Sequence, residues 1–311
     1  MGGRELGARC LAFLAQTTTV SCVLARHDEL SLGTPSRPTV ISIAQERELP
    51  WLAPTAESLS RGDTAAWVAE RSPEIGFCVM FPSLIPAGLL GIPPRGIFNL
   101  HGAPLPEYRG CLGHAWAIIN GENEYGTTMH RMTERLDDGP IVRTRRFSIV
   151  PNETGASLHE KAVEAAFSLF VESLPRLLCG DVIELPQEER VARRYRKSAP
   201  FDRVIQWAWT TSEICTFLRA MRFPGVPEPH TFLGGRRVCV LAARPSRQDH
   251  RHLGSRLPGT VVSVDNDGAV VATGDGSLVL ESVRLQPPES TERLSGPGLT
   301  SILSPGTRLG T

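Results

Sequence analysis

The chain has 311 residues, which at roughly 100–200 residues per domain is enough for two domains with hydrophobic cores. Hydrophobic residues make up 41% and charged residues 21%, a composition that excludes a disordered chain. The 33 basic and 33 acidic residues cancel, which weighs against a general nucleic-acid binder but not against a local basic patch.

The seven cysteines are widely spaced and include no CxxC pair, so we expect reduced thiols rather than a disulfide framework. No apolar run approaches the roughly 20 residues that span a bilayer, and the N-terminal stretch lacks the features of a signal peptide. These patterns predict a cytoplasmic protein without a membrane segment. They leave the oligomeric state open.

The first half of the chain alternates between helical and strand patterns. Helical apolar spacing occurs in three segments: 5–15, 56–71 and 156–179. Short apolar or β-branched runs that predict strands occur in four segments: 17–25, 39–44, 76–81 and 96–100. Strands that alternate with helices predict an α/β fold with a parallel, Rossmann-like sheet.

The start of the chain does not fit this pattern. A Gly-Gly turn that opens a helix normally follows a strand, but Met1-Gly2-Gly3 has nothing before it. We therefore expect the sheet to lack its first strand, and a misassigned start codon would explain this.

After residue 184 the composition of the chain changes, with more charged residues and flanking prolines. The charged, proline-flanked stretch 185–203 predicts a linker after a first domain of residues 1–184. Residues 211–222 predict a short helix, and short strand patterns with NDG and GDG turns then follow at 237–243, 259–265, 268–274 and 277–283. These patterns predict a small C-terminal β-barrel over residues 204–290. Residues 291–311 lack periodicity and are expected to form a mobile tail.

The densest group of polar residues lies near the end of the predicted strand at 96–100. Asn99 and His101 are separated by one residue, so strand alternation places both side chains on one side of the sheet. Asp137 and Asp138 precede Gly139 in a predicted loop. An amide that stabilises an oxyanion, an imidazole that moves protons and a carboxylate that orients the imidazole together suit acyl transfer. A histidine buried in the core for structural reasons would fit the same pattern.

The run NLHGAPLPEYRG and its continuation GHAWAIINGENEYGTTMHRMTERLDDGPIV resemble the formyltransferases that depend on 10-formyltetrahydrofolate. The resemblance covers residues 4–285 and includes the N-x-H, Y-R-G, N-G-E and D-x-G motifs. It implies an OB-like C-terminal barrel. Pro82 and the run APLP depart from the common pattern of the family.

The resemblance also implies roles for individual residues. Asn99 would hold the formyl oxygen, His101 would be the general acid and base, and Asp137 would be the carboxylate partner of His101. The folate would lie against two loops, at residues Phe81, Ser83, Leu84, Ile85, Pro86, Leu136, Asp138 and Gly139. No metal site is predicted, and His130 is expected to be structural.

The acceptor of the formyl group is not determined by the motifs. We expect the primary amine of a small molecule, either an amino-sugar nucleotide or an amino acid of the ornithine type. Methionyl-tRNA is the alternative, for which the basic stretch 193–197 is the only local support. Two further alternatives are water as the acceptor, which the C-terminal barrel disfavours, and a non-catalytic folate-binding remnant.

Overall fold

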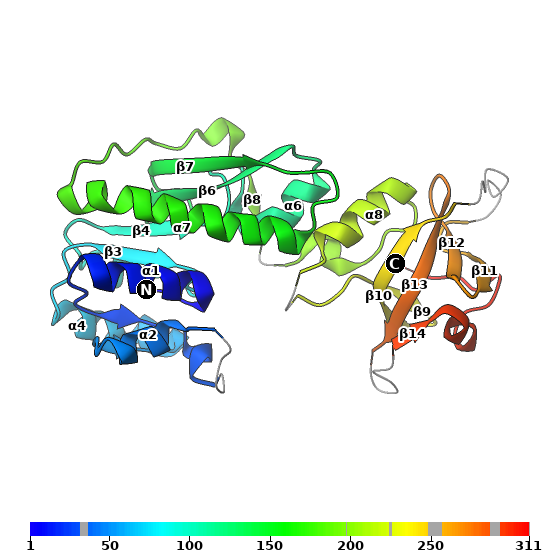
Figure 1. Cartoon of the computed structure of the whole chain (residues 1–311), viewed down its shortest axis with the longest axis horizontal. Helices are drawn as coiled ribbons and strands as arrows, with labels where there is room; N and C mark the ends of the chain where they lie inside the picture. The colour runs from blue at the N-terminus through cyan, green and yellow to red at the C-terminus, as the bar shows by residue number, and fades with distance from the viewer. Residues whose placement is uncertain (32–36, 197, 224–225, 248–256, 287–292, 311) are drawn as a thin grey trace. The chain divides into compact units, whose positions relative to one another are not determined.

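The computed structural model describes residues 1–31, 37–196, 198–223, 226–247, 257–286 and 293–310 (Figure 1). The chain forms two compact units. The first contains Met1–Gly113, Glu124–Ser148 and His159–Arg196, and the second contains His114–Asn123, Ile149–Leu158 and Lys197–Thr311. The predicted α/β class is confirmed for the first unit, and the predicted all-β character is confirmed for the C-terminal part.

The first unit is built on a sheet with helices on both faces. Its main sheet has the order β3-β4-β6-β7, in which β3 and β4 are parallel and the later pairs antiparallel; the strands are β3 (Gly76–Val79), β4 (Ile97–His101), β6 (Glu124–Arg131) and β7 (Ile141–Ser148). Two short parallel pairs are added, β1 (Val23–Leu24) with β2 (Trp51–Leu52), and β5 (Arg109–Gly110) with β8 (Arg194–Tyr195). The hairpin of β6 and β7 was not among the predicted strands.

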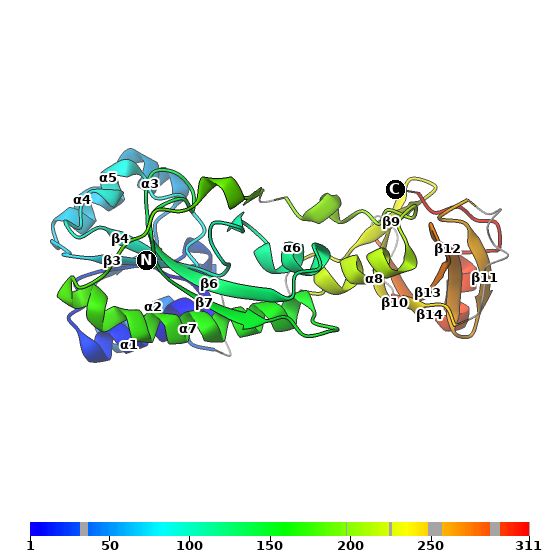
Figure 2. The same ribbon diagram turned by 90° about the horizontal axis from the view of Figure 1, so that it is seen from above.

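Figure 2 shows helices on both sides of β3 and β4. On one side lie α1 (Arg4–Thr17), α2 (Val40–Glu46) and α7 (Gly155–Cys179), and on the other lie α3 (Ala56–Arg61), α4 (Asp63–Ala69) and α5 (Ala87–Leu90). The first unit also contains η1 (His27–Ser31) and η2 (Glu189–Val191), whereas α6 (Gly113–Ile119) belongs to the second unit from His114 onward. Phe98 and Leu100 of β4 pack with α1 and α7 in one core cluster. Ile97 faces the other side and packs with Leu59 and Leu89.

The strand predicted at 39–44 is wrong, because these residues begin α2. Thr39 caps the helix: its hydroxyl accepts from Ser42 N at 3.1 Å, and Ser42 Oγ accepts from Thr39 N at 2.9 Å. Val40, Ile41 and Ala44 are buried on one face of the helix, where they pack with Leu11. Capping and burial here outweigh the preference of β-branched residues for strands.

The place of the first strand is partly filled by residues Met1–Gly3. Gly2 forms parallel bridges with both Ala25 and Val79, so the start of the chain lies between β1 and β3. Gly2 N donates to Leu24 O at 2.9 Å, and Gly3 N donates to Val79 O at 3.1 Å. Met1–Gly3 therefore fills only a short part of the expected gap in the sheet, and α1 begins at the next residue.

The second unit contains α8 (Thr211–Ala220), η3 (Pro200–Arg203) and an antiparallel sheet of order β11-β12-β13-β10-β9, with β14 beside β13. The strands are β9 (His230–Leu233), β10 (Arg236–Pro245), β11 (Val261–Asp265), β12 (Gly268–Ala272), β13 (Ser277–Leu285) and β14 (Arg293–Ser295). Four of them match the predicted strands. Val238, Val261, Leu278 and Leu280 are among the fully buried residues of this sheet.

The expectation of a mobile tail is wrong for the described residues 293–310. They form β14, η5 (Gly296–Ser301) and a final segment in which Arg308 bridges Thr260 and Gly310 bridges Phe232. The final segment thereby joins the two edges of the sheet, as in a barrel. Leu299, Leu303 and Leu309 are buried, but their spacing follows neither helix nor strand periodicity, which is why the sequence pattern does not reveal them.

The predicted linker 185–203 also needs correction. Residues up to Arg196 belong to the first unit, where Leu185 bridges Ile141 and β8 pairs with β5. Of the basic stretch 193–197, Arg194 and Tyr195 form β8, and Lys197 lies outside the described residues. The boundary between the units therefore falls about 12 residues later than the expected end of the first domain.

Candidate active site

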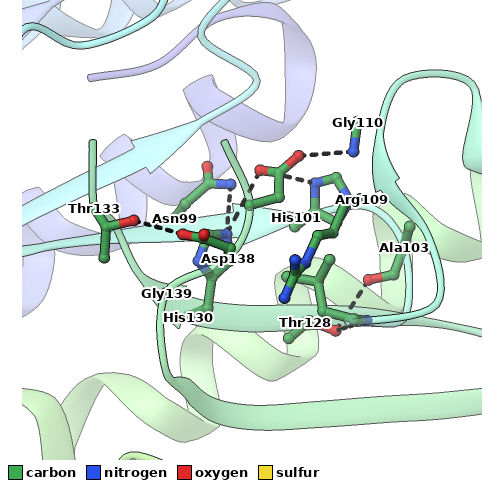
Figure 3. Close-up of polar contacts among 12 residues, drawn as sticks. Asn99, His101, Ala103, Arg109, Gly110, Thr128, His130, Thr133, Asp138 and Gly139 are labelled. Carbon is green, nitrogen blue, oxygen red and sulfur yellow. Dashed lines mark hydrogen bonds and ion pairs between the residues drawn. The ribbon is translucent and has the colours of Figure 1, made fainter. Parts of the chain in front are cut away.

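Asn99 and His101 project from β4 on the sheet face opposite to Phe98 and Leu100, as strand alternation requires (Figure 3). On the neighbouring strand β6, His130 lies directly across from Asn99. Directly opposed residues of an antiparallel pair point to the same face, so the His130 side chain joins the other two. His130, which was expected to be structural, therefore lies in the site beside Asn99.

The hydrogen bonds of His130 fix the orientation of Asn99. Nδ1 of His130 lies 2.9 Å from Arg131 O, a carbonyl that can only accept, so Nδ1 carries the proton. Nε2 is then the accepting nitrogen, and Asn99 Nδ2 donates to it at 3.0 Å. Burial, followed by the charge of His101, lowers the pKa of His130 to about 4, with Asp137 acting in the opposite direction. His130 is therefore a neutral acceptor that aligns the amide of Asn99.

The same reasoning assigns the tautomer of His101. Its Nε2 lies 2.9 Å from Tyr108 O, so Nε2–H donates to this carbonyl. The loop that carries Tyr108 is held by Thr128, whose hydroxyl accepts from Leu105 N and donates to Ala103 O, each at 3.0 Å (Figure 3). Nδ1 of His101 is left with a lone pair and lies 3.7 Å from Asp137 Oδ1. A proton that arrives at Nδ1 is therefore received beside a carboxylate.

Asp137 is buried, with 8% of its side chain exposed, and its backbone has a φ of 55°. Its Oδ2 accepts from Gly110 N at 2.8 Å, which leaves Oδ1 directed toward the two histidines. Aspartate tolerates this left-handed conformation better than most residues. Gly139 is needed for a different reason: a Cβ atom there would lie 1.9 Å from Arg131 O.

Each residue of the Y-R-G motif has a separate task in this arrangement. The carbonyl of Tyr108 orients His101, and the amide of Gly110 holds Asp137. Arg109 is buried and donates from Nε to Gln187 Oε1 at 2.9 Å, while its NH2 group contacts Glu189 at 2.6 Å. The motif therefore ties the site to the segment that follows β7 and α7.

Gln187 is a positioning residue that sequence reasoning did not identify. Its Nε2 donates to Asp137 O at 2.9 Å and to Gly139 O at 2.8 Å, so it holds both ends of the D-x-G turn. It lies 50 residues after Asp137, within the stretch interpreted as a linker. No local pattern in that stretch marks it as part of a site.

Asp138 points away from His101. Its Oδ1 accepts from Thr133 Oγ1 at 2.7 Å, and its Oδ2 pairs with Arg135 at 2.8 Å. The side chain is 7% exposed, so the hydrogen bonds are made inside the loop rather than with solvent. Of the two adjacent carboxylates, Asp137 is the one that lies beside the histidines.

The comparisons with known proteins bear directly on this site. Residues 15–174 match the model of the family described as formyl transferase, and residues 197–293 match the model of the formyl transferase C-terminal domain. The first match alone covers half of the chain and includes Asn99, His101, His130 and Asp137. The chain belongs to the formyl transferase family.

Solved structures share the fold of this formyl transferase. An N-formyltransferase from Helicobacter canadensis, in complex with folinic acid and dTDP-3-aminofucose, is 15% identical, with a TM-score of 0.65 over 90% of this chain and 96% of that one. WlaRD, a sugar 3N-formyl transferase in the presence of dTDP and 5-N-formyl-THF, is 16% identical, with the same TM-score over 92% and 96%. HypX from Aquifex aeolicus, in complex with tetrahydrofolic acid, is 19% identical with a TM-score of 0.63; 97% of this chain covers 46% of HypX.

The loop residues expected to contact folate differ in how exposed their side chains are. Leu84 and Leu136 are exposed, by 72% and 41%, and present apolar surface on the loops after β3 and β6. Ile85 is buried and packs with Phe81 against the core beside β4. Ser83 and Pro86 are both half-buried. Both loops therefore carry one exposed leucine, whereas Ile85 is part of the core beneath its loop.

The described part of the formyl transferase contains no group of three or more His, Cys, Asp or Glu residues arranged to bind a metal ion. Across the same residues, no helix is both long and apolar enough to cross a membrane.

The low pKa of His130 predicts a pH-dependent contribution to stability. In the unfolded chain a histidine binds a proton below about pH 6.5, whereas folded His130 stays neutral down to about pH 4. Between these values the unfolded state binds more protons, so the free energy of unfolding falls as pH falls, by at most about 1.4 kcal/mol per pH unit from this group.

We expect His130→Gln, which keeps an oxygen acceptor for Asn99, to make this dependence shallower. Urea unfolding at a series of pH values from about 4 to about 7 measures it. His27→Gln, which replaces an exposed histidine, is the matched control. Equal slopes for the wild type and His130→Gln would contradict the assignment of His130 as a buried neutral group.

Proposed function

We propose that this formyl transferase moves a formyl group from 10-formyltetrahydrofolate to the primary amine of a small acceptor. The observation that carries the proposal is His101 Nδ1, which lies 3.7 Å from the buried carboxylate of Asp137, on the strand that also carries the oriented amide of Asn99. In support, two proteins of the same fold hold folinic acid or 5-N-formyl-THF.

In the proposed mechanism the acceptor amine attacks the formyl carbon, and a new C–N bond forms. The second N–H of Asn99 Nδ2, which His130 does not use, donates to the oxygen that becomes negative. His101 Nδ1 takes the proton of the amine, and Asp137 stabilises the resulting imidazolium. The same proton passes to N10 of the folate as the bond from N10 to the formyl carbon breaks, which releases tetrahydrofolate.

The folate is proposed to lie between the loop of Phe81–Pro86 and the loop of Leu136–Gly139. The exposed side chains of Leu84 and Leu136 support this placement, because burying them against an apolar ring is favourable. The backbone of the D-x-G turn is held by Gln187, which gives the second loop a fixed shape before substrate arrives.

For the acceptor we propose an amino-sugar nucleotide. The two sugar formyl transferases cover 90% and 92% of this chain and are themselves covered to 96%, so the likeness includes both units. The balance of 33 basic and 33 acidic residues gives no support to an RNA substrate. The odd number of scattered cysteines supports a cytoplasmic location for this reaction.

The test is a formylation assay with four parallel acceptors. Full-length protein is incubated with 10-formyltetrahydrofolate and, in separate reactions, a dTDP-linked amino sugar, ornithine, methionyl-tRNA or buffer alone. Mass spectrometry detects the formylated product, and absorbance follows tetrahydrofolate. We expect turnover with the amino sugar to exceed that with each other acceptor by about tenfold or more, because recognition of a nucleotide and an amine supplies several kcal/mol.

Turnover with methionyl-tRNA or ornithine alone would overturn the proposed acceptor and retain the transferase. Release of tetrahydrofolate without an acceptor would indicate hydrolysis. Binding of the folate with no turnover in any reaction would favour the non-catalytic alternative. The His101→Gln variant controls for contaminating activity.

A further inference from the structure

Three hydroxyl groups of β6 bond to the backbone at the end of β4 and just beyond it. The paired register of β4 with β6 ends at His101 and Thr128, so the strand ladder does not hold the chain after His101. Thr127 Oγ1 donates to His101 O at 2.7 Å. Tyr125 OH donates to the next carbonyl, that of Gly102, at 3.0 Å, and the carbonyl after that accepts from Thr128 Oγ1 at 3.0 Å. Three consecutive carbonyls are therefore each bonded to a different side chain of β6.

Two of these hydroxyls lie on the core face of β6. Strand alternation places Tyr125 and Thr127 on the same face as Met129, which belongs to the core cluster of α1 and α7. Both side chains are almost completely buried. Phenylalanine and valine would fill the same space without burying a polar group, which is unfavourable unless it is hydrogen-bonded. What the two hydroxyls add to packing is therefore the pair of hydrogen bonds to His101 O and Gly102 O.

The surroundings of Tyr125 accommodate its hydroxyl group as a permanent donor. A Cβ atom at Gly113 would lie 2.7 Å from Tyr125 OH, so a glycine at this position leaves room for the oxygen. Burial raises the pKa of Tyr125 well above its usual range, so the phenol keeps its proton throughout the neutral range. Its acceptor, Gly102, has no side chain with which to pack, so the Gly102 peptide is held through its carbonyl.

The loop that begins at these carbonyls returns to His101 at its other end, where Nε2–H of His101 donates to Tyr108 O at 2.9 Å. The ring of Tyr108 packs edge-on against Tyr125, with ring centroids 5.9 Å apart, so Tyr125 contacts both ends of the loop. If Tyr108 O moved away, the proton of the neutral imidazole could reside on Nδ1 instead, beside Asp137 Oδ1. In that tautomer Nδ1 has no lone pair with which to take a proton.

We propose that Tyr125 and Thr127 are positioning residues, which keep the proton of neutral His101 on Nε2 and so leave Nδ1 able to accept the proton of the attacking amine. The inference rests on the proposed role of His101 as the general base. Both hydroxyls act through the backbone, from the face of β6 that is turned away from the site. Their loss should therefore slow turnover without weakening the binding of substrates.

The test uses the full chain with Tyr125→Phe, Thr127→Val or Thr127→Ser, of which only the last keeps a hydroxyl. Nitrogen-15 NMR at about pH 8, where histidines are neutral, shows which nitrogen of each imidazole carries the proton, and the spectrum of His101→Gln assigns the signal. We expect Nε2–H alone in the wild type and in Thr127→Ser, and a mixture of tautomers in the other two variants. In those two, kcat should fall about tenfold while KM stays within about twofold.

Thr231→Val is the matched control, because Thr231 is also buried and donates to a carbonyl, that of Gly310, within the second unit. It should lower Tm as Thr127→Val does and leave kcat within about twofold of the wild type. An unchanged His101 tautomer in Thr127→Val, or an equal loss of kcat in Thr231→Val, would overturn the inference. Because the tautomer is measured without substrate, that outcome is distinct from a failure of the proposed function. The Thr127 pair is sufficient even if Tyr125→Phe does not fold.

Discussion

His101→Gln is expected to lower kcat by about 100-fold or more while the chain stays folded. The glutamine amide can still donate to Tyr108 O, as Nε2–H of the histidine does, so the loop after β4 keeps its contact. The variant has no nitrogen lone pair beside Asp137 and cannot take the proton of the attacking amine. Steady-state kinetics with the acceptor that reacts best measures the effect.

The matched control for this prediction is His159→Gln. His159 belongs to α7, which packs on the sheet face opposite to the site. Its replacement should leave kcat within about twofold of the wild type, as is usual for changes away from the reacting groups. Near-normal turnover in His101→Gln, with an unchanged Tm, would show that the imidazole does not carry the proton transfer.

Asp137→Asn and Asp138→Asn form the second comparison, because adjacent carboxylates with different partners should respond differently. Asp137 supplies the negative charge 3.7 Å from His101 Nδ1, so its loss should lower kcat by about 100-fold. The asparagine side chain in Asp137→Asn would retain an oxygen for the amide of Gly110, which keeps the loop in place. Asp138 bonds to Thr133 and Arg135, and its replacement should change kcat by less than about threefold.

Both variants are read out as kcat and KM separately. A loss confined to kcat in Asp137→Asn indicates an interaction made in the transition state. If Asp138→Asn were the damaging change and Asp137→Asn were tolerated, the assignment of the catalytic carboxylate would be off by one residue. Circular dichroism of each variant excludes unfolding as the cause of a loss.

The fold was predictable wherever local pattern and burial agree. The short apolar run at 96–100 identifies β4, and the apolar spacing in 156–179 identifies α7 almost to its ends. The pattern fails at 39–44, where a capping box and a buried helix face override β-branched propensity. It also fails at Leu303 and Leu309, because an irregular segment that closes a sheet has no period.

The site shows the same division. Asn99, His101 and Asp137 follow from a strand alternation and from motifs that lie close together in the sequence. His130 was assigned to a structural role because the pairing of β6 with β4, which brings it to Asn99, is a long-range register. Gln187 gives no signal at all, since its contacts with Asp137 and Gly139 join segments about 50 residues apart.

Residues 185–196 belong to the first unit, and this has a practical consequence for dividing the protein into fragments. A fragment that ends at residue 184 would omit Gln187, Glu189 and β8, although the sequence suggests that point as a boundary. The D-x-G turn would then lose the two hydrogen bonds that Gln187 donates to its carbonyls. The buried guanidinium of Arg109 would lose its anionic partner, Glu189. A protease that nicks the exposed stretch 188–191 would leave Gln187 attached but would cut the connection from Gln187 to β8. Excision of the catalytic half therefore has to keep residues through Arg196.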